Sequence, residues 1–252
     1  MEHFCYYVTY LYRYQHLAAS TIQTTISAIA HFYKMKNLDN PADYYAVKKL
    51  IAKYGKTSKP AERLPINRKI LTKLLTLTRD RDIDIYYKSA FYTIYFLMYH
   101  MAMRISEICN YSGNTHHAIR LEDIKIKRKT GDVQITLYSY KNSTEPITYT
   151  IKNNDTFLHY LQTYMRLRGP KTGTLMLHRS GSLISRTFVT TQLKNDLTIL
   201  RYNADLYNTH SLRIGRASDM AKEGNSDRQI AAIGRWKSNA FLSYIKNDKV
   251  TV

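Results

Sequence analysis

Four side chains with the chemistry to bind or attack a phosphate lie between Thr209 and Tyr244. His210 and Arg213 are three residues apart, so on a helix that begins near Thr209 both project from one face, about a turn apart. An imidazole and a guanidinium are both hydrogen-bond donors, so we expect them to share one target. Trp236 and the phenol of Tyr244 complete the group, with Tyr244 at the edge of an apolar helix face and its hydroxyl reaching a cleft.

Three short helices are predicted to position these side chains. Gly224 ends the first helix as the residue beyond its C-cap. Ser226 and Gln229 form a capping box that opens a second helix, which Gly234 stops. Trp236 then falls just after a helix end. Ser238 is placed to cap a third helix that carries Tyr244 and extends through Ile245.

A formal net charge of +19 and a pI near 9.8 indicate a polyanionic partner, with nucleic acid the leading candidate. Two alternatives are a basic protein charged for solubility and binding to a membrane surface, but no basic amphipathic helix supports the second. The apolar run 89–103 is too short to span a bilayer and is expected to be a buried helix. The first residues lack the pattern of a signal peptide, so no membrane partner is expected.

Cysteine and histidine usage argues against a metal or disulfide framework. Cys5 and Cys109 alone build neither a disulfide network nor a multi-cysteine zinc site, and they suggest a reducing compartment. His116 and His117 are adjacent, but no carboxylate or cysteine is spaced to complete a site. We expect them to be loop residues, and we expect no metal.

Residues 1–55 are predicted to form a separate helical domain. Ser20 with Gln23 matches a capping box, and Asn40 followed by Pro41 opens a further helix that Gly55 closes. The outer face of that helix carries Lys48, Lys49 and Lys53.

Residues 56–65 are predicted to be a basic interdomain linker, because they contain two prolines and no periodic apolar pattern. The linker carries Lys56, Lys59 and Arg63. Its charge is explained either by solvation or by contact with a phosphate backbone, where it would let two domains close around a duplex. The sequence leaves both open.

Residues 66–252 are predicted to form a second, larger domain. Helices are expected from Ile66 through Leu75 and over 87–103, 156–168 and 185–200. Period-two alternation over 124–128, 133–140 and 147–151 predicts a small antiparallel sheet. The fold class is therefore mainly α with a small antiparallel β-sheet, or α+β.

Two basic residues of this domain have no clear role from their local sequence. Arg104 directly follows the apolar run, where it is either a boundary residue facing solvent or a phosphate clamp. Lys141 lies at the turn between the second and third predicted strands. Most turn lysines are solvated, so both residues need support from elsewhere in the chain.

Taken together, these residues resemble the motifs of the tyrosine recombinases, the phage-integrase family, and the resemblance covers nearly the whole chain. Arg104-Ile-Ser-Glu resembles the first arginine box of the family, and His210-Ser-Leu-Arg213 its His-x-x-Arg box. Lys141 matches the position of the catalytic lysine, Trp236 the His/Trp position and Tyr244 the nucleophile. Each motif is weak alone, whereas five in the right order are specific.

The resemblance implies a role for each matched residue. Tyr244 would attack a DNA phosphodiester to leave a 3′-phosphotyrosine and a free 5′-hydroxyl. Arg104 and Arg213 would hold the phosphate, His210 and Trp236 would donate further hydrogen bonds, and Lys141 would be the general acid. Glu107 would orient His210 or Arg104. No metal, ATP or other cofactor is expected.

The remaining residues of the motif region have ordinary explanations. A tyrosine on an amphipathic helix usually packs in a core, but Tyr244 is the only tyrosine after Tyr207, so no other tyrosine competes for the role. Arg216, Arg228 and Arg235 match no catalytic position and are predicted to be solvated or to contact a backbone.

The family also implies an assembly. Residues 1–55 would be the core-binding domain and 66–252 the catalytic domain of a C-shaped clamp on double-stranded DNA. The DNA contacts would include Lys48, Lys49, Lys53, Lys56, Lys59 and Arg63. A homo-tetramer would form in the synaptic complex from a monomer or weak oligomer.

Few residues follow Tyr244, whereas many members carry a further helix there that docks on a neighbouring protomer. Either the chain is shortened or another segment makes that contact. Whether Tyr244 acts in cis or in trans stays open.

Within the family, three stretches are most similar to the recombinases of cryptons and DIRS-like elements: Leu212-Arg-Ile-Gly, Gly234-Arg-Trp-Lys-Ser and Arg63-Leu-Pro-Ile. This resemblance implies a mobile-element recombinase or transposase, located in the nucleus if the source is eukaryotic and otherwise in the cytoplasm at the nucleoid. The alternatives are a type IB topoisomerase, which shares the chemistry, and a domesticated protein that binds DNA without cleaving it.

Overall fold

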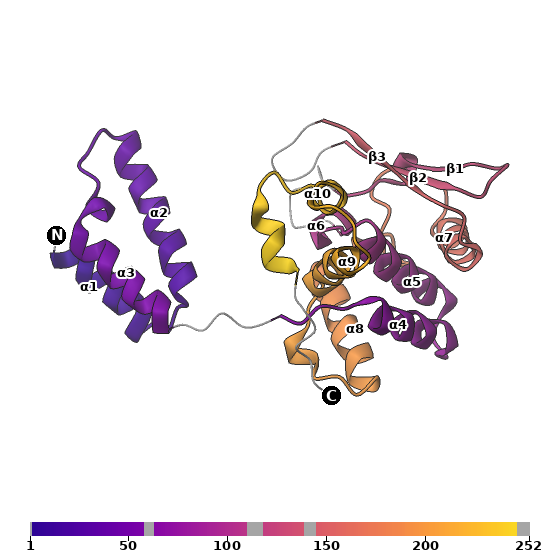
Figure 1. Cartoon of the computed structure of the whole chain (residues 1–252), viewed down its shortest axis with the longest axis horizontal. Coiled ribbons are helices and arrows are strands. Elements are labelled where there is room, and N and C mark those ends of the chain that lie inside the picture. Colours follow the sequence, from indigo (N-terminus) through magenta and orange to yellow (C-terminus); the bar gives the residue numbers. More distant parts are fainter. Residues whose placement is uncertain (1, 58–62, 110–117, 139–144, 246–252) are drawn as a thin grey trace. The chain divides into compact units, whose positions relative to one another are not determined.

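A computed structural model describes residues 2–57, 63–109, 118–138 and 145–245 (Figure 1). The chain divides into two compact units, Met1–Glu62 and Arg63–Val252. No helix among the described residues is both long and apolar enough to cross a membrane.

The first unit is helical. It consists of α1 (Glu2–Arg13), α2 (Ala19–Met35), the 3-10 helix η1 (Pro41–Asp43) and α3 (Tyr45–Thr57). Each helix buries one face, and the small core contains Val8, Leu11, Ile22, Ile26 and Val47, with the rings of Tyr12 and Tyr54 stacked 3.8 Å apart. One apolar stripe per helix is what the helical periodicity of this segment predicts.

Three local predictions in this unit are wrong. Ser20 and Gln23 form no capping box, because α2 already begins at Ala19 and has no side-chain cap. Asn40 does cap a helix, accepting a hydrogen bond from the Ala42 backbone at 3.1 Å, but it opens only η1. Gly55 does not close α3, which continues to Thr57.

The second unit contains the helices and strands on which the motif residues lie. Its elements are α4 (Arg68–Asp80), α5 (Ile85–His100), α6 (Ile105–Ile108), η2 (Leu121–Asp123), β1 (Ile124–Ile126), β2 (Val133–Leu137), β3 (Ile147–Ile151), α7 (Asp155–Arg168), α8 (Arg186–Ile199), η3 (Ala204–Leu206), α9 (His210–Lys222), α10 (Asp227–Gly234) and η4 (Asn239–Tyr244). Helix α5 is buried along nearly its whole length, as its continuous apolar sequence predicts, and packs against α4, α7 and α9 (Figure 1).

The three strands form an antiparallel sheet in the order β1-β2-β3, which confirms the fold class predicted from the sequence. Val133, Ile135 and Leu137 of β2 are buried while the residues between them are partly exposed, as expected for a sheet with one face on a core. The first two strands are shorter than predicted. The turn that contains Lys141 lies outside the described residues.

The start of the second unit is bonded to the region around α9. The backbone N–H of Ile66 donates to the Ser211 carbonyl at 2.9 Å, and that of Leu64 donates to Leu206 at 2.8 Å. A Cβ atom on Gly215 would lie 1.8 Å from the carbonyl oxygen of Ile66, so glycine is required for this approach. Residues 56 and 57 continue α3 and residues 63–65 belong to the second unit, while 58–62 lie outside the described residues.

The end of α9 and the start of α10 follow the predicted signals. Gly224 has a φ of 79° just beyond the C-cap of α9, and Ser226 and Gln229 form the capping box of α10. Helix α10 ends at Gly234, as predicted, and the left-handed residue that follows it is Arg235. The third predicted helix is the 3-10 helix η4.

Candidate active site

Arg104 is the N-cap residue of α6, just after the turn that ends α5. The Glu107 carboxylate binds both the backbone N–H and the guanidinium of Arg104. The Arg104 backbone N–H donates to Glu107 Oε2 at 2.8 Å, and its Nη1 donates to Glu107 Oε1 at 3.0 Å. The Arg104 side chain is 24% exposed, whereas that of Glu107 is 1% exposed. The carboxylate therefore fixes an arginine that a ligand can still reach.

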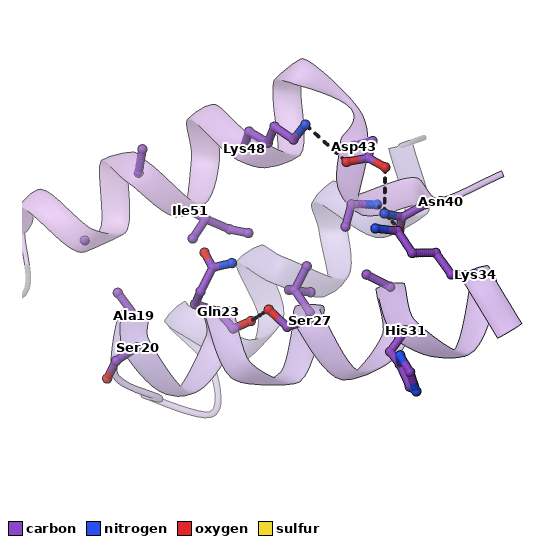
Figure 2. Close-up of a pocket in the computed structure, with 15 residues that line it drawn as sticks. Ala19, Ser20, Gln23, Ser27, His31, Lys34, Asn40, Asp43, Lys48 and Ile51 are labelled. Carbon is purple, nitrogen blue, oxygen red and sulfur yellow. Dashed lines mark hydrogen bonds and ion pairs between the residues drawn. The ribbon is translucent and has the colours of Figure 1, made fainter. Parts of the chain in front are cut away.

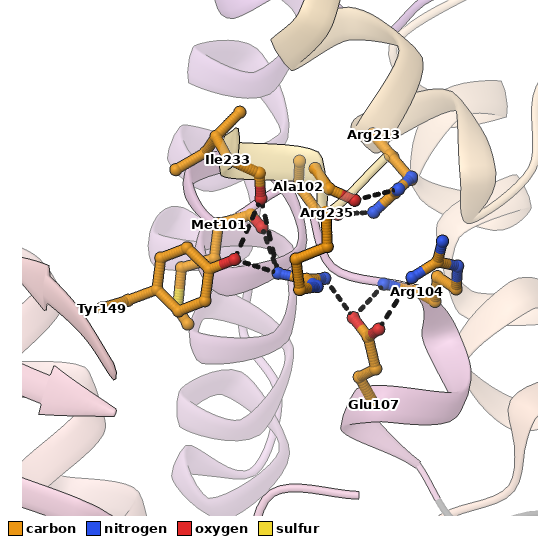
Figure 3. A network of polar contacts seen from close by, with 9 residues as sticks. Met101, Ala102, Arg104, Glu107, Tyr149, Arg213, Ile233 and Arg235 are labelled. Atoms are coloured by element: carbon orange, nitrogen blue, oxygen red, sulfur yellow. Dashed lines mark hydrogen bonds and ion pairs between the residues drawn. The ribbon is translucent and has the colours of Figure 1, made fainter. Parts of the chain in front are cut away.

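Arg213 lies one turn into α9 and is 1% exposed. Its Nη1 donates to the carbonyl of Ala102, and its Nη2 donates to the carbonyl of Gly234 (Figure 3). Its guanidinium carbon lies 4.2 Å from the centroid of the Trp236 ring. Two carbonyls and one ring thus fix the plane of this guanidinium, which joins the turn before Arg104 to the end of α10.

His210 begins α9, where its backbone N–H donates to the side chain of Asn208 at 2.9 Å. Burial, with the positive charges of Arg213, Arg104 and Arg186 adding to it, lowers the pKa of His210 to about 4. The imidazole is therefore neutral at pH 7, with one N–H donor and one acceptor nitrogen.

Glu107 has a second arginine partner that the sequence did not indicate. Arg235 Nη2 donates to Glu107 Oε2 at 2.5 Å, and both side chains are almost fully buried (Figure 3). Arg235 was predicted to be solvated or to contact a backbone. The prediction of a solvated residue is wrong, because the side chain also bonds to Tyr149 Oη at 2.5 Å and to the Met101 carbonyl at 3.3 Å.

Arg216 and Arg228 differ from each other. Arg216 is partly buried, with its guanidinium carbon 5.8 Å from the centroid of the Tyr99 ring and its Nη1 4.0 Å from Glu223. Full solvation is therefore also wrong for Arg216. Arg228 is exposed on α10, as predicted.

The structure brings together five residues predicted for the site: Arg104, Glu107, His210, Arg213 and Trp236. They come from α6, α9 and the segment after α10. Tyr244 closes η4, but its side chain is outside what the structure describes, as are Lys141, His116 and His117. Glu107 was expected to orient His210 or Arg104, and its bonds show that it holds Arg104.

The basic residues predicted to contact DNA are spread over both units. Lys48 pairs with Asp43 at 3.2 Å and Lys49 lies 5.1 Å from the Tyr45 ring centroid, both on α3. Lys53 and Lys56 are exposed on the same helix, and Lys59 is outside the described residues. Arg63 Nη1 donates to the Asp205 carbonyl at 2.6 Å, so it helps to bond the start of the second unit to η3.

A basic groove of about 340 Å³ lies directly beside His210, between α8 and the start of α9. Its lining includes three cations, Arg63, Arg186 and Lys194, and a row of threonine hydroxyls from Thr187, Thr190, Thr191 and Thr209. Arginine and hydroxyl donors of this kind suit phosphate oxygens. The sequence did not single out this groove, because its residues belong to no motif.

The first unit contains a larger groove, of about 740 Å³, between α2 and α3 (Figure 2). Its lining includes small side chains such as Ala19, Ser27 and Ala52, together with His31, Lys34 and the Lys48–Asp43 ion pair. Among the described residues of both units, no group of three or more histidine, cysteine, aspartate or glutamate side chains is arranged to hold a metal ion.

Several solved structures share this fold. A structure of the Tn1549 transposon integrase in complex with transposon right-end DNA has a TM-score of 0.65 at 12% identity, covering 97% of this chain and 80% of that one. XerA recombinase has a TM-score of 0.55 at 16% identity, covering 98% and 78%. A lambda integrase dimer bound to a COC′ core site has a TM-score of 0.54 at 13% identity, covering 93% and 63%.

No curated protein matches the chain significantly. The family model described as "Phage integrase family" matches residues 66–249, which include both arginine boxes, Trp236 and Tyr244. That match covers most of the chain, and the fold agrees with it. The chain therefore belongs to the phage integrase family and is a tyrosine recombinase.

Proposed function

We propose that this protein is a site-specific DNA recombinase or transposase that cleaves and rejoins DNA through a 3′-phosphotyrosine intermediate, without metal or ATP. The observation that carries the proposal is the convergence of Arg104, His210 and Arg213 from two motifs far apart in the sequence. The charges of both arginines lower the pKa of His210, and Arg213 lies over the ring of Trp236. A cluster of two arginines and a neutral imidazole suits a phosphodiester.

The chemistry supports each assignment. When a phosphodiester is attacked, negative charge builds on its non-bridging oxygens, and fixed cations and donors stabilise that charge. Arg104 is the arginine that a phosphate can reach, and Arg213 adds a second positive charge held in a fixed plane. Neutral His210 donates one further hydrogen bond.

The reaction exchanges one phosphoester bond for another. As the bond from Tyr244 Oη to phosphorus forms, the bond from phosphorus to O5′ breaks, the phenol gives up its proton to solvent water, and the departing O5′ takes a proton from Lys141. Attack by a 5′-hydroxyl on the phosphotyrosine reverses these steps. The phosphoester energy is kept, so no ATP is needed. The fixed arginines stabilise the developing negative charge that a metal ion would otherwise stabilise.

The proposed partner is double-stranded DNA, and the net charge of +19 supports it. The groove lined by Arg63, Arg186 and Lys194 would bind the backbone next to the reacting phosphate, and the exposed lysines of α3 would bind it from the first unit. The solved relatives include an integrase in complex with transposon DNA and a lambda integrase dimer bound to a core site. A homo-tetramer on two DNA sites would carry out strand exchange.

Two finer assignments rest on the sequence. The stretches Leu212–Gly215, Gly234–Ser238 and Arg63–Ile66 support a crypton or DIRS-like mobile-element recombinase, which would act in the nucleus. The fold requires glycine at both position 215 and position 234 of these stretches, since a Cβ atom at either position would overlap a neighbouring residue.

Covalent capture tests the proposed function. The chain is incubated with a library of nicked duplexes of random sequence, in which cleavage releases a short fragment and prevents rejoining. Protein-linked DNA that survives denaturation is recovered and sequenced. We expect enriched sequences in the wild type and no covalent product with Tyr244→Phe, while Tyr54→Phe, a tyrosine of the first unit, leaves the product unchanged.

The outcomes separate the alternatives. Covalent product with exchange of strands between two duplexes supports a recombinase. Relaxation of supercoiled DNA without exchange would indicate a type IB topoisomerase. Binding without covalent product would indicate a domesticated DNA-binding protein, and a product that persists in Tyr244→Phe would contradict the assignment of the nucleophile.

A further inference from the structure

Arg235 has an unusual backbone conformation for an arginine. Its φ of 57° and ψ of 43° lie in the left-handed region, which glycine and asparagine prefer at helix ends. The preceding residue is a glycine, Gly234, but it does not adopt the left-handed conformation, and its lack of a side chain is needed for a different reason. A Cβ atom there would lie 1.9 Å from the Trp236 ring. The glycine is thus required by the ring, and the left-handed turn falls on Arg235.

The side chain of Arg235 makes contacts that hold it in this conformation. Its Nη1 donates to Tyr149 Oη at 2.5 Å and to the Met101 carbonyl at 3.3 Å, and its Nη2 donates to Glu107 at 2.5 Å (Figure 3). Its guanidinium carbon also lies 5.4 Å from the centroid of the Tyr149 ring. One side chain therefore joins the sheet, the end of α5 and α6.

The Glu107 carboxylate is shared between two arginines. Oε2 accepts from Arg235 Nη2 and from the backbone N–H of Arg104, and Oε1 accepts from Arg104 Nη1. The two cations differ in exposure, because the side chain of Arg235 is 2% exposed and that of Arg104 is 24% exposed. A ligand can reach one partner of Glu107 and not the other.

The cluster of Arg104, Glu107 and Arg235 contains two positive charges and one negative charge. Buried Arg235 and buried Glu107 together are neutral, so the charge of Arg104 is left uncompensated at the edge of the cluster. If Arg235 were neutral, Glu107 would pair with Arg104 alone and would cancel most of its attraction for an anion. Water screens such effects weakly at a buried site.

We propose that Arg235 is a positioning residue for the cleavage reaction, an inference that rests on the proposed function. It neutralises Glu107 from the buried side, so that Glu107 orients Arg104 without cancelling its charge toward the reacting phosphate. Arg235 itself does not touch the phosphate. Substrate binding depends on many other contacts, so the effect should appear in the rate of cleavage and not in DNA affinity.

The first test compares Arg235→Met, which removes the charge, with the double variant Arg235→Met/Glu107→Gln, which restores neutrality at the buried pair. The readout is the single-turnover rate of covalent complex formation at saturating duplex. We expect Arg235→Met to slow it on the order of 100-fold, as for loss of an electrostatic contact to the reacting group, with DNA affinity changed less than about twofold. The double variant should recover about tenfold of the loss.

A merely structural role predicts a different result, because two substitutions would then slow the reaction at least as much as one. No recovery in the double variant, or a wild-type rate in Arg235→Met, overturns the proposal. Arg235→Lys keeps the charge and should stay within about tenfold of wild type. Arg79→Met is the matched control, since Arg79 pairs with Asp80 at 2.7 Å on the exposed surface of α4 and should not change the rate.

A second readout does not require cleavage. Trp236 is the only tryptophan in the chain and lies over Arg213, so its fluorescence reports anions that enter the cluster. Titration with inorganic phosphate should show weaker binding to Arg235→Met and recovery in the double variant. If the wild type binds phosphate but forms no covalent DNA complex, the proposed function fails while this titration still decides the role of Arg235. Equal phosphate affinities in wild type and Arg235→Met overturn it.

Discussion

The guanidinium carbon of Arg213 lies 4.2 Å from the centroid of the Trp236 ring, and the same guanidinium bonds to the carbonyls of Ala102 and Gly234. The stacking of an arginine on an indole is among the stronger cation–π contacts. The two motif residues therefore support each other directly. Trp236 also packs against Phe241 of η4, with ring centroids 5.9 Å apart, so the contact continues toward the segment that carries Tyr244.

Substitutions of Trp236 should separate its packing role from its role as a donor. Trp236→Ala removes the ring over Arg213 and should lower the free energy of unfolding by about 2–3 kcal/mol, below the usual cost for a fully buried tryptophan. Trp236→Phe should keep most of the stability but slow cleavage by about 10- to 100-fold, because the N–H donor is lost. Trp236→His should cleave faster than Trp236→Phe. Urea unfolding and single-turnover cleavage measure the two effects, and equal rates for Phe and His would rule out the donor role.

Gly215→Ala should be strongly destabilising. Its Cβ atom would lie 1.8 Å from the carbonyl oxygen of Ile66 and 2.4 Å from the carbonyl carbon, and backbone atoms cannot rotate away as a side chain can. We expect a loss of about 3 kcal/mol or more in the free energy of unfolding, as for severe overpacking. Gly55→Ala is the matched control, since Gly55 lies within α3 with no atom near its missing Cβ. It should stabilise the first unit by about 0.5–1 kcal/mol.

Stability should fall between pH 6.5 and pH 4. Burial is the main cause that lowers the pKa of both His100 and His210 from 6.5 to about 4, with nearby arginines adding to it. The unfolded chain therefore binds more protons in this window, and the free energy of unfolding decreases as the pH falls through it. The loss is at most about 3 kcal/mol for each histidine.

Urea unfolding at several pH values measures this dependence. His100→Gln should remove about half of it, whereas His159→Gln, an exposed control in α7, should leave it unchanged. An unaltered slope in His100→Gln would show that this imidazole is not buried in its neutral form.

Arg186→Gln should weaken DNA binding without changing which sequence is preferred. Arg186 lines the basic groove beside His210, where a phosphate contact would release about one counterion. We expect the slope of log affinity against log salt concentration to become smaller by about 1, with similar losses on all duplexes. Lys125→Gln, an exposed lysine of β1, is the charge-matched control. An unchanged slope in Arg186→Gln would remove this groove from the DNA-binding surface.

Much of the fold followed from patterns in the sequence because those patterns have direct physical causes. The continuous apolar run predicted the buried helix α5, and alternation predicted three strands that pair antiparallel, as the structure shows. The failures are at element ends. Gly55 was expected to end a helix, but an exposed glycine with no conflicting neighbour is tolerated within α3.

The motif residues were predictable because each has an unusual chemistry for its position, such as an arginine at the end of an apolar run. Arg235 was not, because its partners Glu107, Tyr149 and Met101 come from three separate elements. No spacing in the sequence connects them, and an arginine after a helix is usually solvated. The only available signal was its position directly before Trp236.

The burial of Arg213 has an evolutionary consequence. Because this arginine cross-links the end of α5 to the end of α10, selection for a stable fold alone would retain it in a descendant that no longer cleaves DNA. Arg104 is more exposed, and among the residues that the structure describes its side chain bonds to Glu107, three positions away in the sequence. In a lineage released from selection for recombination, Arg104 should therefore vary before Arg213, so that the state of Arg104 indicates whether a relative is still an active enzyme.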